Sequence, residues 1–363
     1  MTEEYAFEPF FRYLYKTTGN RLHFSASSRQ ETIAWQNRLR DQLKQLLGWP
    51  LLAEIEQQQE IEPLPRELWE RKTPDQLTVC ARSIATLPLV RLPFYVLYPA
   101  HYSATKLYKT VICLPAHGAN KEVVAGLADC PETAQKLQAS PAEAYGQEFC
   151  RRGYIAVCPD PAGFGARQEK LAAEDQAFGG ITQLNPLGSS CGKLAETAEA
   201  FGLSQAGLIA WELRKLLDYL ATLPSVDLNH LGVAGFSGGG GAALWLAALD
   251  PRINLAVISG YIHGYYDSLL DTHLCACNYV PGLWRWADMS DLAALIAPRA
   301  LFIENGRSDI ENGSRGIAGP AEQVQKIRQA YRQFGAEDKL CFSTPAGPHA
   351  WHATCYEFVD LNL

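Results

Sequence analysis

The sequence has no cluster of lysine and arginine and no apolar run of membrane-spanning length. Its 363 residues include 32 basic and 39 acidic side chains, a formal net charge of −7, and the two signs are scattered along the chain. Without a basic patch, neither nucleic acid nor an anionic membrane is an expected partner. Without a long apolar run, no membrane span is expected either. We expect a small-molecule substrate, and the sequence leaves the oligomeric state open, including a homo-oligomer.

The features of a secretory leader are also missing. The segment Met1–Tyr5 is acidic where a signal peptide would be basic, and no apolar segment follows it. The ten cysteines are spread widely, and some, such as Cys113 and Cys158, lie in apolar strand-like runs. Because a core of this size does not need disulfide bonds, we interpret these as buried thiols and expect a cytoplasmic protein.

The sequence contains no internal repeat and no low-complexity tract, and its first part is helical. Ser28 and Glu31 form a capping box before a helix whose apolar residues include Trp35 and Leu39 at helical spacing, and Gly48 ends it. We expect residues 1–74 to be a helical extension that packs on the main domain rather than an independent domain.

The remainder, residues 75–363, alternates between strand-like and helix-like segments. The expected strands are Phe94–Tyr98, Thr110–Leu114, Tyr154–Cys158, Leu231–Gly235, Leu255–Ser259, Ala300–Glu304 and Leu340–Thr344. Several are continuous apolar runs, as expected for strands that are covered on both faces. The pattern predicts an α/β fold with a mostly parallel central sheet and helices on both faces. Ligands in such sheets bind beyond the carboxyl ends of the strands.

Two long segments interrupt this alternation directly after strands. They cover residues 162–203 and 261–297 and are rich in glycine, asparagine and aromatic residues. Insertions at strand ends often cover a site, so we expect these two to lie over the active site. Their candidate substrate-contacting side chains, which could also be ordinary packing residues, are Phe164, Arg167, Tyr261, Tyr265, Tyr266, Trp284 and Trp286.

The segment Leu231–Gly241 carries the strongest chemical signal. A buried strand leads into Gly235-Phe236-Ser237-Gly238-Gly239, which matches G-x-S-x-G, and a helix pattern follows at once. This is the context of a nucleophile elbow, in which a strained turn raises a serine hydroxyl above the sheet. There are two competing interpretations. One is a glycine-rich loop that merely turns the chain, which the strand before it and the helix after it disfavour. The other is a phosphate-binding loop, but no lysine follows these glycines, and Ala243 stands where G-x-G-x-x-G would require glycine. We predict Ser237 as the nucleophile.

A serine nucleophile needs a base and an acid, which follow it in this order of elements. His349 lies in a Gly/Pro turn after the last expected strand and is the predicted base, with His352 as its competitor. Asp309 lies after the preceding strand and is the predicted acid, with Glu304 as the alternative. Asp288, in the second insertion, is a weaker alternative.

The oxyanion of an ester-cleavage intermediate needs two backbone N–H donors. Gly238, directly after the nucleophile, is the first predicted donor, and Ala119, in the loop after Thr110–Leu114, is the second. His117 in the same loop has no second ligand at zinc spacing. Cys275 and Cys277 have no matching pair elsewhere, so we interpret them as two thiols. No metal and no cofactor is expected.

Together these motifs resemble those of a bacterial branch of the α/β-hydrolase superfamily, described as dienelactone-hydrolase-like or acetyl-xylan-esterase-like. The resemblance covers about residue 92 to the C-terminus and rests on Pro115–Asn120 with Gly126, Asp160–Arg167, the elbow, Cys277–Gly282, Asp288-Met289, Leu295–Arg299 and Gly347–His352. It implies a triad of Ser237, Asp309 and His349, and it supports a donor at Ala119, where relatives with a His-Gly-Tyr loop carry tyrosine.

The sequence also departs from that branch. Asp160-Pro161-Ala162-Gly163-Phe164-Gly165 stands where relatives often have Asp-x-Arg-Gly-Phe-Gly, and Gly347-Pro348-His349 replaces a Gly-Gly-His turn. Dienelactone hydrolases proper use a cysteine nucleophile, so their lactone substrate does not carry over to a chain with Ser237.

The predicted function is that of a serine hydrolase that cleaves a carboxylic ester through an acyl-enzyme. An acetylated sugar or another small ester is the expected substrate, and the sequence does not separate it from a lactone, a thioester or a small amide. Two alternatives remain, an exopeptidase or amidase on the same fold and a catalytically silent hydrolase fold that binds a ligand or a protein.

Overall fold

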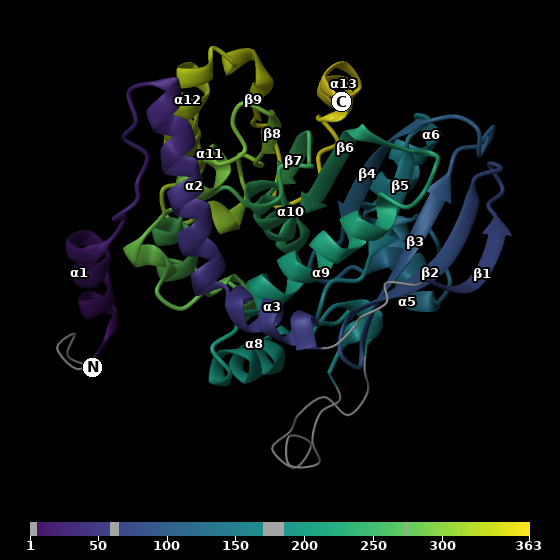
Figure 1. The fold of residues 1–363 in the computed structure, drawn as a ribbon, viewed down its shortest axis with the longest axis horizontal. Coiled ribbons are helices and arrows are strands. Elements are labelled where there is room, and N and C mark those ends of the chain that lie inside the picture. Colours follow the sequence, from purple (N-terminus) through teal and green to yellow (C-terminus); the bar gives the residue numbers. More distant parts are fainter. Residues whose placement is uncertain (1–5, 59–64, 170–184, 273) are drawn as a thin grey trace.

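The described part of the protein is built around one mixed β-sheet of nine strands. The computed structural model describes residues 6–58, 65–169, 185–272 and 274–363. The strands are β1 (Arg66–Lys72), β2 (Thr78–Leu87), β3 (Val90–Tyr98), β4 (Tyr108–Leu114), β5 (Ile155–Pro159), β6 (Val226–Phe236), β7 (Leu255–Ser259), β8 (Ala300–Glu304) and β9 (Leu340–Ser343). Their order across the sheet is β1-β2-β3-β5-β4-β6-β7-β8-β9 (Figure 1).

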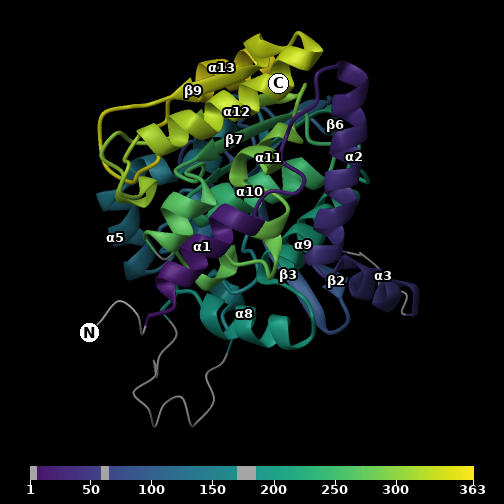
Figure 2. The same cartoon turned by 90° about the vertical axis from the view of Figure 1, so that its left-hand side faces the viewer.

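The helices lie on both faces of this sheet (Figures 1 and 2). They are α1 (Glu8–Thr18), α2 (Arg29–Leu46), α3 (Trp49–Gln58), α4 (Lys121–Val124), α5 (Pro131–Ala139), α6 (Tyr145–Arg151), α8 (Cys191–Ala200), α9 (Gln205–Leu220), α10 (Gly238–Leu249), α11 (Met289–Ala294), α12 (Ala318–Phe334) and α13 (Tyr356–Asn362). Short helical turns are η2 (Pro141–Glu143), η3 (Gly165–Arg167), η4 (Tyr266–Leu270), η5 (Ala276–Asn278), η6 (Leu283–Arg285), η7 (Ile310–Asn312) and η8 (Glu337–Lys339).

The parallel part of the sheet runs from β5 through β4, β6, β7 and β8 to β9. β5, β7 and β8 are buried along their whole length, and β4 and β6 are buried at their carboxyl halves. One apolar core packs under α2, α9, α10, α11 and α12, and a second lies under α4, α6 and α13 on the opposite face. The predicted α/β architecture, with a mostly parallel sheet covered on both faces, is confirmed.

An antiparallel edge precedes this parallel part. β1, β2 and β3 pair antiparallel with their neighbours, and β3 joins the sheet through an antiparallel pairing with β5. The sheet therefore begins at Arg66, inside the segment expected to be helical, and the boundary near residue 75 falls too late. The seven side chains of β1, Arg-Glu-Leu-Trp-Glu-Arg-Lys, are all exposed, so no buried face gave the sequence a strand signal.

Helix α2 packs along the face of the sheet that carries α11. The Ser28 side chain accepts a hydrogen bond from the Glu31 N–H at 3.2 Å, which is the capping-box contact expected from the sequence. Trp35 and Leu39 are buried in the larger core. Gln36 Nε2 donates at 2.8 Å to the Ala297 carbonyl, so a buried polar contact joins the N-terminal helix to the main sheet domain.

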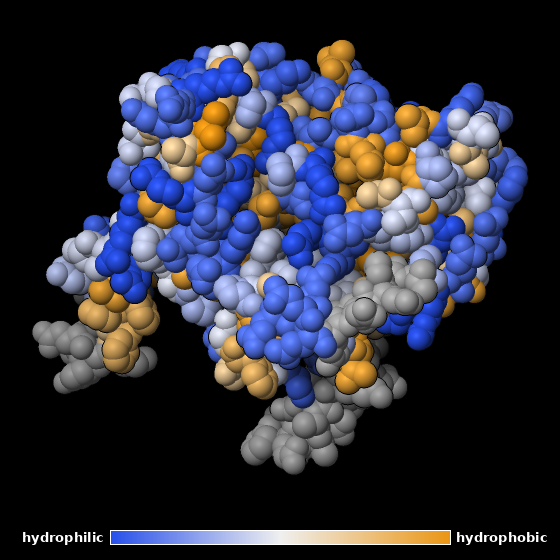
Figure 3. All heavy atoms as spheres, in the orientation of Figure 1, coloured by the Kyte–Doolittle hydropathy of each residue, from blue (hydrophilic) through white to orange (hydrophobic). Residues whose placement is uncertain are grey.

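Helix α1 lies at the periphery and exposes aromatic side chains. Phe7, Phe10 and Phe11 are 71%, 50% and 49% exposed, and Figure 3 shows apolar surface among hydrophilic residues in this part of the molecule. Arg12 attaches the helix to the second insertion through an ion pair with Asp271 at 2.8 Å. Among the helices of the described residues, none is both long enough and apolar enough to cross a membrane.

Candidate active site

Ser237 occupies a sharp turn between β6 and α10. Its backbone angles are φ 54° and ψ −121°, a region that residues other than glycine seldom adopt. The Ser237 N–H donates to the Ser259 carbonyl on β7 at 2.9 Å, and the Ser237 carbonyl accepts from the Gly241 N–H at 3.0 Å. The surrounding hydrogen bonds therefore hold the strained serine in place, and the strand–turn–helix context expected from G-x-S-x-G is present.

The glycines on either side of Ser237 are required by space. A Cβ atom on Gly235 would lie 2.1 Å from the Gly239 carbonyl oxygen, and one on Gly239 would lie 2.0 Å from the carbonyl oxygen of Leu114. Both obstacles are backbone atoms, which cannot rotate away. Close approach of β6, α10 and β4 therefore depends on the two glycines of the motif.

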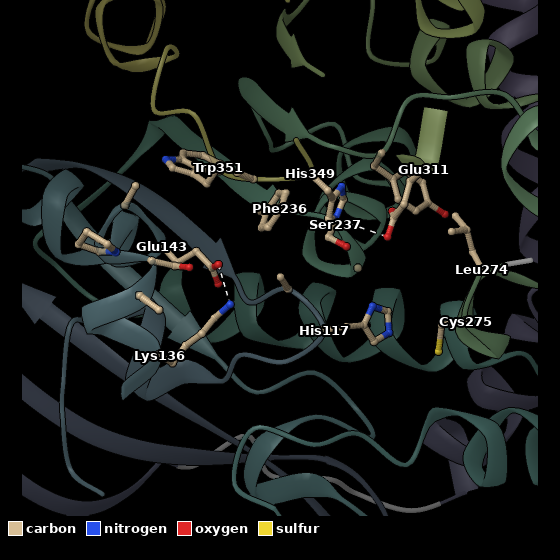
Figure 4. A pocket seen from close by; sticks show the side chains of 18 of the residues that line it. His117, Lys136, Glu143, Phe236, Ser237, Leu274, Cys275, Glu311, His349 and Trp351 are labelled. Atoms are coloured by element: carbon tan, nitrogen blue, oxygen red, sulfur yellow. Dashed lines mark ion pairs between the residues drawn. The ribbon is translucent and has the colours of Figure 1, made fainter. Parts of the chain in front are cut away.

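His349 lies beside the elbow, in the loop that follows β9. Its ring centroid lies 4.6 Å from that of Phe236, the residue before the nucleophile, and the close-up shows Ser237 and His349 next to each other in the pocket wall (Figure 4). His349 Nδ1 lies 2.8 Å from Asp309 Oδ2. Nε2 is buried and has no hydrogen-bond partner among the described residues, so it is the ring atom available to take a proton.

Asp309 follows β8 and begins the turn η7. Its Oδ1 accepts the Glu311 N–H at 2.8 Å, which orients the carboxylate so that Oδ2 meets His349. Burial would raise the pKa of Asp309, but the hydrogen bond and the positive charge of His349 outweigh it and lower that pKa. Burial lowers the pKa of His349, but the hydrogen bond to Asp309 and the negative charges of Glu311 and Asp309 more than offset this, so the pKa is raised. Asp309 is thus held ionised against the imidazole.

The alternative acids and the alternative base have other partners. Glu304 Oε1 accepts from the Ser259 hydroxyl and the His352 N–H, both at 2.9 Å, so this carboxylate fixes the loop after β9. Asp288 caps α11 by accepting the Met289 N–H at 2.8 Å. The ring Nε2 of His352 lies 3.0 Å from the Pro348 carbonyl. None of these contacts involves Ser237, and the structure pairs His349 with Asp309 instead.

A second carboxylate, Glu311, was not predicted. Its Oε1 lies 3.5 Å from His349 Nε2 (Figure 4), and burial is the largest cause of the raised pKa of this carboxyl. Glu311 thus faces Nε2, the ring atom of His349 that points away from Asp309. Its proximity to Asp309 in sequence gave no sign of this, because the side chain reaches His349 only through the turn η7.

The two predicted oxyanion donors differ in how they fit the structure. Gly238 lines the pocket directly after Ser237. Ala119, however, is 1% exposed, and its N–H donates to the Ala116 carbonyl at 3.1 Å. This turn hydrogen bond occupies the Ala119 N–H, so the assignment of Ala119 needs correction. Ala116 and His117 of the same loop line the pocket in its place.

The pocket that contains Ser237 and His349 has a volume of about 680 Å³. One wall is polar, with Lys136 of α5 in an ion pair with Glu143 of η2 at 2.8 Å, while Tyr261 and Trp351 add aromatic surface (Figure 4). The sequence did not single out α5 or η2 as walls. The pocket lies at the carboxyl ends of the parallel strands, where the α/β pattern predicted it.

The candidate aromatic and arginine residues of the insertions mostly pack. Of the seven, Tyr261 lines this pocket. Arg167 forms a two-pronged ion pair with Glu212 at 2.5 and 2.9 Å, and the Phe164 ring packs on His117 with a centroid distance of 4.8 Å. Trp284 packs against Tyr15 of α1. These side chains therefore hold the insertions against the rest of the protein.

The structure also brings His117 together with three cysteines, a grouping that the sequence did not predict. His117, Cys191, Cys275 and Cys277 come from three distant segments, yet one ligand atom from each lies within 4.8 Å of the corresponding atom of every other member. We call these four residues the thiol–imidazole cluster. No spacing motif could have revealed it, because only two of its members are near each other in sequence.

The fold and the turn at Ser237 define the class of protein. A mostly parallel sheet that carries a strained serine after β6, an aspartate after β8 and a histidine after β9 is the architecture of an α/β hydrolase. The chain belongs to the Abhydrolase family, whose model matches residues 11–341.

Individual relatives are more distant. The chain is 27% identical over 212 residues to "Putative hydrolase YtaP" of Bacillus subtilis (strain 168), a match of 53% of this chain and 58% of the relative's own length. A "putative acetyl xylan esterase" from Bacteroides fragilis NCTC 9343 has a TM-score of 0.71 at 18% identity, covering 94% of this chain and 82% of that one. "Methylesterase BT1017" has a TM-score of 0.66 at 20% identity, covering 97% and 66%. At these identities the structural likeness concerns the fold.

Proposed function

We propose that the protein is a serine esterase that cleaves a small carboxylic ester through an acyl-enzyme, with Ser237, His349 and Asp309 as its triad. The observation that carries the proposal is the 2.8 Å contact between His349 Nδ1 and buried Asp309, in a ring that lies next to the strained Ser237 (Figure 4). The printed names of two structural relatives, an acetyl xylan esterase and a methylesterase, favour an ester as the substrate.

In the first half of the reaction, His349 Nε2 takes the Ser237 proton while the serine oxygen bonds to the ester carbonyl carbon. The negative charge on the carbonyl oxygen is stabilised by the Gly238 N–H and, in our revised assignment, by the His117 N–H. The bond to the alcohol breaks, and the proton passes from His349 to the leaving oxygen. Water then repeats the sequence on the acyl-enzyme, releasing the acid and restoring Ser237.

The shape and polarity of the pocket suggest the substrate class. A volume of about 680 Å³ accommodates a small ester but not a polymer chain lying wholly inside it. The Lys136–Glu143 ion pair and Tyr261 offer hydrogen-bonding and stacking surface to a hydroxylated alcohol. An acetylated sugar is therefore the substrate that we expect among small esters.

The proposal is tested with p-nitrophenyl acetate, acetylated sugars and aminoacyl-p-nitroanilides. The wild type should release acetate, and Ser237→Ala should lower kcat/KM by a factor on the order of 10³ or more. Ser314→Ala, at an exposed serine outside the pocket, is the matched control and should retain activity. Preference for the anilides would instead indicate an exopeptidase or amidase.

Labelling by a fluorophosphonate probe separates an enzyme from a binding protein on the same fold. The wild type and Ser314→Ala should be labelled, whereas Ser237→Ala should not. A wild-type protein that is folded yet neither labelled nor active on any of these substrates would contradict the proposal.

A further inference from the structure

We propose that the thiol–imidazole cluster binds one zinc ion in a closed structural site at the rim of the pocket. His117 follows β4, Cys191 begins α8, and Cys275 and Cys277 lie at η5 of the second insertion. The proposal does not depend on the esterase assignment, because none of the four side chains belongs to the triad.

The separations match those of a tetrahedral zinc site. With Zn–S bonds of about 2.3 Å and Zn–N bonds of about 2.0 Å, tetrahedral geometry places sulfur atoms about 3.8 Å apart and sulfur about 3.5 Å from nitrogen. In the structure His117 Nε2 lies 3.3 Å from Cys277 Sγ and 3.7 Å from Cys191 Sγ. All four ligand atoms lie within 4.8 Å of one another. An ion at their centre requires only small adjustments.

The surroundings of the sulfur atoms suit thiolates. Gln205 Nε2 lies 3.3 Å from Cys191 Sγ, and Asn278 Nδ2 lies 3.6 Å from Cys277 Sγ, so two side-chain amides donate toward the proposed ligands. Such outer donors orient metal ligands and stabilise their charge. Both sulfur atoms belong to buried residues, where the negative charge of several thiolates needs a cation nearby.

Ordinary packing does not account for the arrangement. Buried cysteines usually act as small apolar groups, as Cys113 and Cys150 do in the second core. Here the sulfur atoms of three cysteines from two distant segments gather around one imidazole ring. His117 Nε2 is the atom aimed at the sulfurs, whereas Nδ1 lies toward Gly238, where an added Cβ would approach it to 2.6 Å.

Four protein ligands make a closed site rather than a catalytic one, because no position is left for water or substrate. Such a site would join the loop after β4, the first turn of α8 and η5. His117 and Cys275 both line the pocket, on the side opposite the Lys136–Glu143 pair (Figure 4). The zinc ion would thus hold the two insertions against the loop that supplies the His117 N–H.

The test measures metal content in the full chain, purified without a polyhistidine tag. We expect one zinc ion per wild-type chain by inductively coupled plasma mass spectrometry, and loss of most of it in Cys191→Ser and Cys277→Ser. Cys130→Ser is the matched control, because Cys130 is a free cysteine at the start of α5, outside the cluster. It should keep the wild-type zinc content.

A second measurement needs no variant and so does not depend on folding of a mutant. Wild-type protein stripped with a chelator is titrated with Co²⁺, and a thiolate-to-cobalt charge-transfer band with tetrahedral d–d absorption should saturate at one equivalent. Zinc should abolish both signals. A wild-type chain that contains no zinc and gives no such band overturns the proposal. So does a disulfide between two cysteines of the cluster in protein purified under reducing conditions.

Discussion

At the scale of the residue, His349 lies between two carboxylates, each of which faces a different nitrogen of its ring. Asp309 holds Nδ1 in a hydrogen bond of 2.8 Å, whereas Glu311 faces Nε2 at 3.5 Å. In the proposed mechanism, the first contact would fix the tautomer in which Nε2 is the free base. In the same mechanism, the negative charge of Glu311 would stabilise the positively charged ring.

Substitution of Asp309 tests the orienting role. In Asp309→Asn the amide can keep a contact with His349 but favours the wrong tautomer, so kcat for ester cleavage should fall on the order of 10⁴-fold. Asp338→Asn, at an exposed aspartate of η8, is the control and should leave kcat unchanged. Steady-state kinetics and the thermal midpoint are measured together. An active Asp309→Asn would shift the role of acid to another carboxylate.

Substitution of Glu311 tests its effect on the base. The pKa of His349 is raised by Asp309, Glu311 and Glu143 against the lowering by burial, and the ring must be neutral to accept a proton. Activity should therefore rise as pH increases through this raised pKa. Removing one negative charge in Glu311→Gln lowers the pKa, so the acidic limb of kcat/KM should move to lower pH.

The control for this pH shift is Glu357→Gln, which removes a negative charge from the exposed side of α13. Its profile should coincide with that of the wild type. A Glu311→Gln profile that also coincides with the wild type would show that Glu311 does not act on the catalytic imidazole.

Sequence reasoning correctly predicted the positions of residues that follow from the order of strands along the chain, while their catalytic roles stay a prediction. Ser237, Asp309 and His349 each follow a strand of the parallel sheet, and the structure brings the last two into contact. It failed where side chains meet only in space. Glu311 reaches His349 through a turn, and the ligand atoms of the thiol–imidazole cluster converge from segments far apart.

At the scale of the element, the elbow depends on backbone proximity between β4, β6 and α10. Gly239→Ala would put a Cβ atom 2.0 Å from the Leu114 carbonyl oxygen, and neither backbone can move without shifting the nucleophile. We expect a loss of about 1–3 kcal/mol or more in the free energy of unfolding, together with loss of esterase activity.

Gly192→Ala is the matched substitution in another helix. No heavy atom lies within 4 Å of its added Cβ, so it should leave stability unchanged or raise it by about 0.4–1 kcal/mol. Urea unfolding compares the two variants. Equal stability of Gly239→Ala and the wild type would contradict the close approach.

The burial of each strand explains which strands could be predicted from the sequence. All seven expected strands are present, because the buried runs of the parallel sheet leave a continuous apolar signal. β1 and β2 were missed for a different reason. β1 is charged and exposed. β2 is mostly buried, but Arg82 and Ser83 interrupt its apolar residues, so neither strand has a continuous apolar run in the sequence.

At the scale of the whole molecule, the N-terminal helices pack with the sheet domain. Trp35 of α2 is 3% exposed in the same core as α11 and α12, and its Nε1 donates to the Leu22 carbonyl at 2.8 Å. Trp35→Ala should therefore cost about 3–5 kcal/mol. We expect activity and intrinsic fluorescence to be lost in one shared urea transition at a lower midpoint.

Ile33→Ala provides the comparison on the same helix, because Ile33 is 44% exposed. It should shift the midpoint much less than Trp35→Ala does. Separate transitions for fluorescence and activity would show instead that the N-terminal helices unfold independently of the sheet domain.

The order of the functional strands along the chain has a consequence for synthesis. Ser237 follows β6, whereas Asp309 and His349 follow β8 and β9, the last two strands, and Leu363 packs back into the core at the chain's end. During synthesis from the N-terminus, the chain thus contains Ser237 before it contains the two groups that would activate it in the proposed mechanism. The proposed nucleophile would therefore become reactive only after the segments that follow β8 and β9 have been made and have folded against it.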